Sequence, residues 1–224
     1  MQKTQLMRAA IFDMDGVLAD SEPLICAAAR AMFLEHGLVV RAEDFEPFVG
    51  AGENRYIGGV AEKYGLALDL IVAKARTYEL YLKMVPATLK VFPGAFELVT
   101  ACRAVGWRCA IASSADRIKV EANLRKIGLP IETWHAVVTA EDVERRKPDP
   151  ALFLKAADRL GVPPAFCTVI EDAVNGIAAA KAAGMRCIAV ATSFPRAKLT
   201  QADRVRTSIQ EVTLADLQGF DPER

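Results

Sequence analysis

Two aspartates separated by one residue end the first apolar run of the sequence, in the stretch IFDMDGVLADS at residues 11–21. Side chains two residues apart lie on the same face of a strand, so Asp13 and Asp15 are expected to point into one site. Carboxylates this close repel each other, but two clustered carboxylates can share a hard cation, or one can attack a substrate while the other transfers a proton. The pair alone is also consistent with an ordinary turn, which Gly16 would allow in either case.

Three further polar motifs follow apolar runs later in the chain. Ser113 and Ser114 precede a predicted helix, where hydroxyl and free N–H groups bind anions. Lys147, in RRKPDP, lies on a proline-flanked loop from which an ammonium group can reach a phosphate oxygen. Glu171 and Asp172 end another apolar run, and buried carboxylates require a partner, commonly a metal ion. Each motif alone also has a plain structural explanation, as a helix cap, a solvated lysine or acids at a helix start.

The elements that must position these residues are short apolar runs alternating with helical patterns. Apolar runs typical of strands buried on both faces occur at 7–13, 107–114, 135–140, 166–172 and 185–192. Helical patterns, each followed by a glycine, occur at 94–105, 115–127, 150–160 and 174–183. The alternation predicts an α/β fold with a Rossmann-like parallel sheet covered by helices. Because parallel strands end at one edge, the four motifs are expected to form one site.

One segment, residues 22–87, interrupts this alternation. It contains helical stretches such as PLICAAARAMFLEHG and LDLIVAKARTYELYLKM but no convincing strand. We therefore predict an α/β core domain of residues 1–21 and 88–224, with residues 22–87 inserted as a helical cap. The insert leaves the core just after the acidic motif, so its glycine-rich loop at residues 50–55 is expected to face that motif.

Composition limits the classes of function. The 28 Lys and Arg balance the 28 Asp and Glu, so no overall charge favours nucleic acid or an anionic membrane. No apolar run reaches the ~18 residues of a membrane helix, and the first residues turn acidic too soon for a secretory signal. The five cysteines, without CxxC spacing, are expected to be reduced, and two histidines poorly supply a zinc or serine-hydrolase site. We expect a soluble, cytoplasmic protein without an obligate protein partner.

The ordered set of motifs resembles the haloacid dehalogenase (HAD) superfamily over essentially the whole chain. The resemblance is carried by DMDGVLADS (13–21), SSADR (113–117), KPDP (147–150) and EDAVNGI (171–177), and the insert stands where that superfamily has a small α-helical cap. Within it, the chain looks most like the β-phosphoglucomutase-like phosphatase group. The stretches FEPFVGAGENRYIGGVAEKYG and SSADRIKVEANL also resemble the corresponding domain of plant suppressor-of-quenching proteins, a likeness that implies no substrate.

The resemblance implies a Mg²⁺-dependent phosphatase. Asp13 would be the nucleophile that forms an aspartyl phosphate, and Asp15 would be the general acid and then the general base. Ser113 and Lys147 would hold the transferring phosphate. The Mg²⁺ ligands would be Asp13, the backbone carbonyl of Asp15, Asp172 and, directly or through water, Glu171. The substrate would be a small phosphorylated metabolite such as a sugar phosphate. The residues expected near the substrate are Ser21, Glu22, Gly50, Arg55, Ser114, Ala115 and Asn175.

Two other functions stay open. A phosphosugar mutase would use the same core, but where β-phosphoglucomutases carry a histidine and a phosphate-binding arginine this chain has Ile25 and Glu53, with Arg55 close to the second position. A regulatory module that had lost turnover would not need the complete set of acids, serine and lysine. Because dehalogenation has no use for an acid at position 15, phosphoester hydrolysis is the leading prediction.

Overall fold

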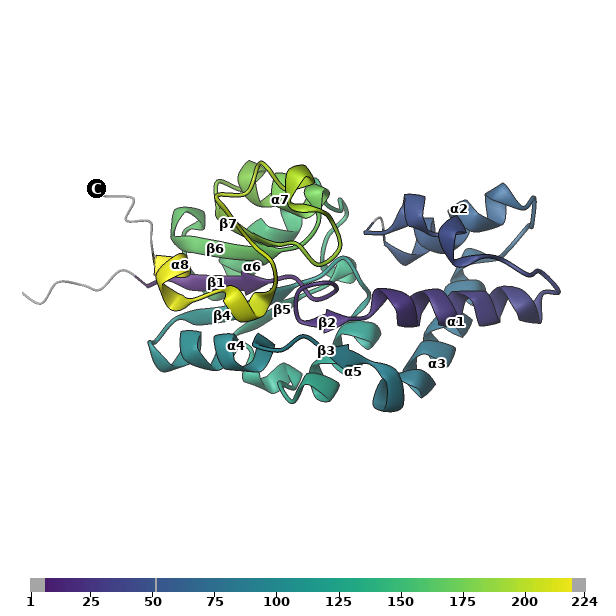
Figure 1. Cartoon of the computed structure of the whole chain (residues 1–224), viewed down its shortest axis with the longest axis horizontal. Coiled ribbons are helices and arrows are strands. Elements are labelled where there is room, and N and C mark those ends of the chain that lie inside the picture. The colour runs from purple at the N-terminus through teal and green to yellow at the C-terminus, as the bar shows by residue number, and fades with distance from the viewer. Residues whose placement is uncertain (1–6, 51, 219–224) are drawn as a thin grey trace, which may run out of the picture.

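Six parallel strands form one sheet in a computed structural model of the chain, which describes residues 7–50 and 52–218. Their order is β5-β4-β1-β6-β7-β8, so the first strand lies near the middle (Figure 1). The strands are β1 (Ala9–Phe12), β4 (Arg108–Ala112), β5 (Ala136–Val138), β6 (Cys167–Glu171), β7 (Arg186–Val190) and β8 (Arg204–Arg206). The predicted parallel sheet is confirmed. The hydrophobic pattern does not predict β8, because its sequence, RVR, is largely polar.

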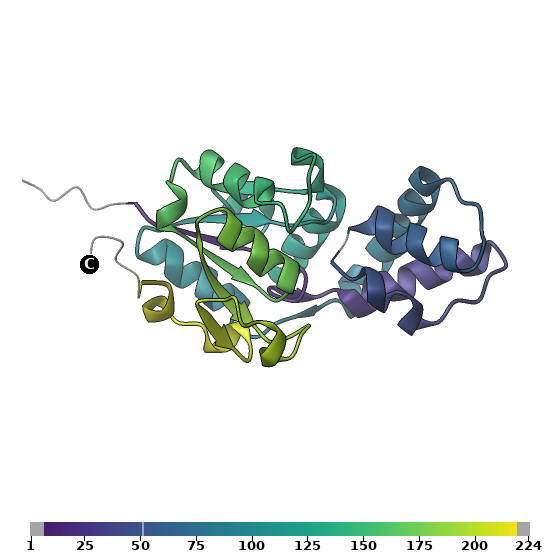
Figure 2. The same ribbon diagram turned by 90° about the horizontal axis from the view of Figure 1, so that it is seen from above.

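Helices cover both faces of this sheet (Figure 2). Ala10 and Phe12 of β1 belong to the apolar cluster that includes α4 and α5, whereas Ala9 and Ile11 belong to the cluster that includes α6 and α7. Because side chains alternate along a strand, a strand buried on both faces has to be apolar throughout. The helices of the sheet region are α4 (Ala95–Ala104), α5 (Arg117–Ile127), α6 (Ala151–Leu160), α7 (Val174–Ala182) and the short α8 (Leu214–Gln218).

Three more helices stand to one side of the sheet, beyond the carboxyl end of β1 (Figures 1 and 2). They are α1 (Glu22–Glu35), α2 (Glu53–Lys63) and α3 (Leu70–Thr88). Before α1, β2 (Ala19–Asp20) pairs antiparallel with β3 (Lys90–Val91), which follows α3. The two passages between the sheet region and these helices therefore lie side by side. The division into a core domain and a cap of residues 22–87 stays a prediction.

The long helix α3 joins these helices to α5. Nζ of Lys74 lies 2.6 Å from a carboxylate oxygen of Asp116, and the hydroxyl of Tyr81 donates to the side-chain carbonyl of Asn123 at 2.7 Å. At the far end of the contact, Nζ of Lys126 donates to the carbonyl of Pro86 at 2.7 Å. Polar contacts along the length of α5 therefore fix the insert against the sheet region.

The glycine-rich stretch of the insert differs from its prediction as a loop over residues 50–55. The loop ends at Gly52, because α2 begins at Glu53, and position 51 lies outside the described residues. Gly59 lies inside the helix, where an added Cβ would stand 2.3 Å from Cζ of Phe48. Glycine there serves close packing and not backbone freedom.

Two other expectations concern the whole chain. All five cysteines lie in the described part and are free thiols, as predicted, and all but Cys26 are buried. No helix among residues 7–50 and 52–218 is long and apolar enough to cross a membrane.

The turn into α4 provides a matched test of packing. Gly94 (φ +89°) and Gly106 (φ +81°) share the left-handed conformation. A Cβ at Gly94 would stand 2.5 Å from the Cα of Gln210, but no described atom lies within 4 Å of a Cβ at Gly106. Gly106→Ala should add only the backbone strain, about 1–2 kcal/mol. Gly94→Ala should lower the free energy of unfolding by a further ~1–3 kcal/mol in urea titrations, because backbone must move. Equal losses would contradict the close approach.

Candidate active site

The predicted motifs meet at the carboxyl edge of the sheet. Asp13 directly follows β1, Ser113 follows β4, and Glu171 ends β6. The backbone N–H of Asp13 donates to the carbonyl of Ile170 at 3.0 Å, and that of Ser113 donates to the carbonyl of Val138 at 3.0 Å. Sheet hydrogen bonding therefore continues one residue beyond each strand and fixes where these two side chains start.

Three buried carboxyl groups cluster around one ammonium group at this edge. One carboxylate oxygen from each of Asp13, Glu171 and Asp172 lies within 4.8 Å of the others. Nζ of Lys147 lies 2.5 Å from Oδ1 of Asp13 and 2.8 Å from Oε1 of Glu171. The other oxygen of Glu171 accepts the N–H groups of Asp172 (2.7 Å) and Ala173 (2.6 Å), which fixes the orientation of the carboxylate. The structure thus brings together the acids and the lysine that the sequence singles out.

Burial governs the proton affinities in this cluster. It raises the pKa of Asp13 to about 7, with Lys147 opposing and Glu171 adding to the rise. Burial, together with Glu171 and Asp13, also raises the pKa of Asp172 well above its usual value. Burial alone would lower the pKa of Lys147, but Asp13 and Glu171 raise it above its ordinary value, so the lysine stays charged. Further positive charge at this point would favour the ionised carboxyl groups.

The donor set fits a hard divalent cation. It consists of carboxylate oxygens, the ligand type that Mg²⁺ prefers. Two positions next to these carboxylates have space only for glycine. A Cβ at Gly16 would stand 1.9 Å from Oδ2 of Asp172, and a Cβ at Gly176 would stand 1.8 Å from Oε1 of Glu171. The identity of the metal ligands stays a prediction.

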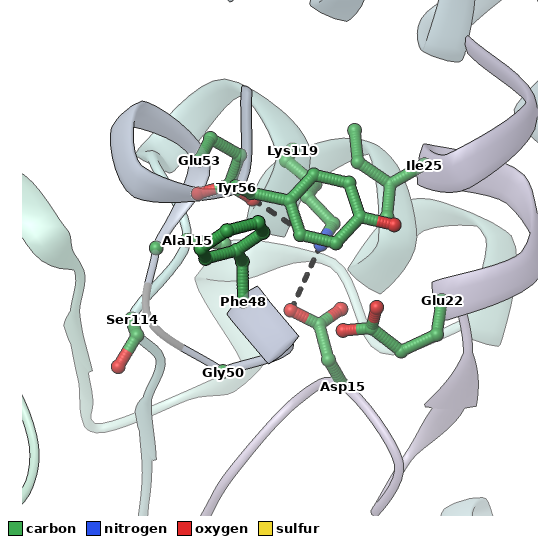
Figure 3. A pocket seen from close by; sticks show the side chains of 11 residues that line it. Asp15, Glu22, Ile25, Phe48, Gly50, Glu53, Tyr56, Ser114, Ala115 and Lys119 are labelled. Atoms are coloured by element: carbon green, nitrogen blue, oxygen red, sulfur yellow. Dashed lines mark hydrogen bonds and ion pairs between the residues drawn. The ribbon is translucent and has the colours of Figure 1, made fainter. Parts of the chain in front are cut away.

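Asp15 lies between this cluster and a second buried ammonium group. The hydroxyl of Ser21 donates to Oδ1 of Asp15, and Nζ of Lys119 lies 3.0 Å from Oδ2. Lys119, on α5, is 2% exposed, and its Nζ also lies 3.4 Å from Oε1 of Glu53 on α2 (Figure 3). Burial alone would lower the pKa of Lys119, but the carboxylates of Asp15 and Glu53 raise it well above its usual value. Lys119 therefore links the acidic motif to the insert as a cation.

Two cavities meet at Asp15. The first, which we name the acid cavity, contains the carboxylate cluster and Lys147; the second, the cap pocket, lies toward the insert and is drawn in Figure 3. Residues that line both are Asp15, Glu22, Gly50 and Ser114. The cap pocket is further lined by Ile25, Phe48, Gly52, Glu53, Tyr56, Ala115 and Lys119. Burial raises the pKa of Glu22 to about 7, against the opposing charge of Lys119.

Most residues predicted near a substrate border these cavities. Glu22, Gly50 and Ser114 line both, and Ala115 lines the cap pocket. Asn175 lines the acid cavity, and its Nδ2 donates to the carbonyl of Gly50 at 3.3 Å, so it also ties the insert's loop to α7.

Two predicted residues are buried, and their hydroxyl groups form hydrogen bonds within the protein. The buried hydroxyl of Ser113 accepts the N–H of Ala115 at 3.1 Å, and Ser114, not Ser113, stands among the described residues lining the cavities. Ser21 is fully buried and its hydroxyl holds Asp15, so its contact is with the acid and the expected substrate contact has no support.

Arg55 is not brought into the site. Its Nη1 lies 2.8 Å from Oε2 of Glu62, and its guanidinium lies 5.0 Å from the ring centroid of Phe48. Among the described residues, the lining of the two cavities includes Glu53 and not Arg55. Because α2 begins at Glu53, the helix turns Arg55 toward solvent, and the expectation that it contacts substrate has no support in the structure.

Lys119 is a site residue that the sequence analysis missed. The signal available was its spacing: Lys119, Asn123 and Ile127 recur at intervals of four and are all buried. A lysine on the buried stripe of a helix requires a partner, and such a position marks a candidate site residue.

Proteins of known family are similar to this chain over most of its length. A model of the family described as haloacid dehalogenase-like hydrolase matches residues 7–184. Protein SUPPRESSOR OF QUENCHING 1, chloroplastic, of Arabidopsis thaliana is 47% identical over 214 residues, which are 93% of this chain and 20% of that protein. The chain therefore spans one fifth of that relative. Hexitol phosphatase B of Escherichia coli is 31% identical over 239 residues, covering 98% of this chain and 100% of that protein.

A solved structure shares the fold as well. The crystal structure of a CbbY mutant from Rhodobacter sphaeroides in complex with xylulose-(1,5)bisphosphate superposes with a TM-score of 0.87. The two sequences are 28% identical, and the match covers 95% of this chain and 99% of that one. The α/β fold, with its insert, is therefore shared across nearly the whole length of both chains.

Removing the central ammonium group tests how the buried carboxylates are balanced. Lys147→Met should lower the free energy of unfolding of the metal-free protein by about 3–5 kcal/mol, because buried negative charge loses its partner. Urea titrations in EDTA measure this. Lys155→Met, on the exposed side of α6, is the control and should change stability by less than about 0.5 kcal/mol. Unchanged stability of Lys147→Met would mean that the carboxyl groups need no cation.

Proposed function

The chain belongs to the haloacid dehalogenase-like hydrolases, as its motifs predict, and we propose that it is a Mg²⁺-dependent phosphatase acting through an aspartyl phosphate. The observation that carries the proposal is the cluster in which Lys147 bridges Asp13 and Glu171 beside Asp172. The proposed nucleophile, the ammonium group of Lys147 and the proposed metal ligands line one cavity, and Asp15 lines both this cavity and the second. Relatives named as phosphatases, hexitol phosphatase B among them, support hydrolysis of phosphorylated metabolites.

The proposed reaction has two displacements at phosphorus. A carboxylate oxygen of Asp13 attacks the phosphorus of a phosphate monoester, and the bond from phosphorus to the ester oxygen breaks. Asp15 donates a proton to the departing oxygen, which leaves as an alcohol. Water then attacks the aspartyl phosphate while Asp15 takes up its proton, and inorganic phosphate leaves Asp13 free.

Other side chains hold the phosphoryl group in this proposal. Lys147, which stays charged, lies against Asp13 and stabilises the charge that develops on the phosphoryl oxygens. The hydroxyl of Ser113 accepts from Ala115, so its own proton is free to be donated to a phosphate oxygen. The neighbouring residue in the sequence, Ser114, lines both cavities.

Mg²⁺ would be held by the carboxylates of Asp13 and Asp172 and by the backbone carbonyl of Asp15. Both oxygens of Glu171 already accept hydrogen bonds, so Glu171 would act through water. The bound cation would offset the repulsion between the carboxylates and an incoming phosphate.

The leading substrate class is a small phosphorylated metabolite such as a sugar phosphate. The two relatives above whose names state a substrate or ligand concern a hexitol phosphate and a sugar bisphosphate. Ile25 lines the cap pocket, where the resemblance to β-phosphoglucomutases would place a histidine. Of the described residues that line the two cavities, none is histidine, which favours transfer to water over transfer to a second sugar position.

A panel of phosphorylated metabolites tests the proposal directly. With Mg²⁺ we expect release of inorganic phosphate from at least one small monophosphate, and we expect loss of that activity in excess EDTA. Ca²⁺ should inhibit, because it accepts more oxygens at longer distances and does not reproduce the Mg²⁺ geometry. Undiminished hydrolysis in EDTA would exclude the proposed metal dependence.

Replacing the nucleophile gives the sharpest mutational test. Asp13→Asn should reduce the rate of p-nitrophenyl phosphate hydrolysis by about three decades or more, since an amide is a poor nucleophile of nearly the same size. Thermal melting should stay near that of the wild type. The control is Asp158→Asn, an exposed aspartate of α6, which should keep its activity. Retained turnover in Asp13→Asn would rule out the covalent mechanism.

A further inference from the structure

One buried oxygen of a residue that lines the cap pocket is left without a partner. Glu53 is 6% exposed, and its Oε1 lies 3.4 Å from Nζ of Lys119. Its Oε2 is buried and finds no hydrogen-bond donor among residues 7–50 and 52–218. An unpaired buried carboxylate oxygen is costly, so the position suits a donor supplied by a bound molecule.

The charge around this oxygen is unbalanced. Of the described residues that line the cap pocket, Asp15, Glu22 and Glu53 carry carboxyl groups, and Lys119 carries the only ammonium group. Figure 3 shows these four side chains around the same space. The contacts of Lys119 are with Asp15 and Glu53, so its charge is already shared between carboxylates. The pocket therefore offers acceptors, and it lacks a free cation in its described lining.

The position of Asp15 determines which part of a substrate enters this pocket. A general acid has to lie within hydrogen-bond distance of the ester oxygen that it protonates. Asp15 borders both cavities, and Lys147 and the carboxylate cluster lie in the acid cavity. With the phosphoryl group in the acid cavity, the alcohol part of the ester extends into the cap pocket.

We propose that Glu53 is the residue that determines specificity in the cap pocket: it favours an uncharged alcohol part whose hydroxyl groups can donate to its Oε2, and it excludes an alcohol part carrying a second phosphate. Hydroxyl groups would donate to Oε2 of Glu53 and replace its missing partner. A second phosphate would add negative charge where carboxylates already prevail. The inference rests on the proposed phosphatase activity, and it adds the residue that discriminates between phosphate esters.

The test compares matched pairs of sugar phosphates, such as glucose 6-phosphate with glucose 1,6-bisphosphate and the pentose equivalents. Each kcat/KM is divided by that of the same enzyme for p-nitrophenyl phosphate, so that effects on the core chemistry cancel. The wild type should favour the monophosphate in every pair. Glu53→Gln, which keeps size and removes charge, should shift the ratio toward the bisphosphate by about tenfold. Glu62→Gln is the matched control on the exposed side of α2 and should leave the ratio unchanged.

The outcomes separate this inference from the activity on which it rests. Hydrolysis of p-nitrophenyl phosphate, with bisphosphates turned over as well as monophosphates by the wild type, would overturn the inference alone. An unchanged ratio in a folded Glu53→Gln variant would do the same. The wild-type ratio needs no variant, so it decides even if Glu53→Gln is unstable. Failure to hydrolyse any ester in the presence of Mg²⁺ would overturn the proposed function and, with it, this inference.

Discussion

Repulsion among buried carboxylates is the constraint on which this structure depends. Asp13, Glu171 and Asp172 bring three buried acidic groups close together, and such groups stay ionised only with a cation close by. Lys147 provides that cation from a loop far along the chain. The sheet order, with β1 next to β6 and β4, is what makes these distant segments neighbours. Loss of the ion pairs of Lys147 at this edge would therefore weaken both the fold and the candidate site.

A second buried ammonium group connects the site to the helical insert. Lys119 holds Asp15 on one side and Glu53 on the other, and α3 packs against the same helix, α5, through Tyr81 and Asn123. The insert is thus fixed relative to the proposed acid–base residue by contacts with α5. Any shift of α2 would change the partners of Lys119, so the electrostatic environment of Asp15 depends on where the insert lies.

The core was predictable from sequence because its physics is local. Strands buried on both faces have to be apolar runs, and polar residues that follow such runs in a parallel sheet reach one edge, so Asp13, Ser113 and Glu171 could be placed together. The insert was less predictable because its contacts are tertiary. An acid at the start of a helix is the ordinary pattern near the helix dipole, which hides the burial of Glu53. The close approach of Phe48 to Gly59 is likewise a tertiary contact that the local sequence does not indicate.

The same contrast decides where information about the substrate lies. Attack at phosphorus requires the same groups whatever alcohol is released, so the acids and the lysine of the core cannot distinguish one phosphate ester from another. Discrimination has to come from groups that touch the released alcohol, and in the proposed reaction those groups line the cap pocket. Glu53 lines this pocket, whereas Arg55 pairs with Glu62 outside it. Helix α2 therefore contributes a negative charge to the pocket and not a positive one. The proposed discrimination between phosphate esters therefore depends on Glu53 and not on Arg55.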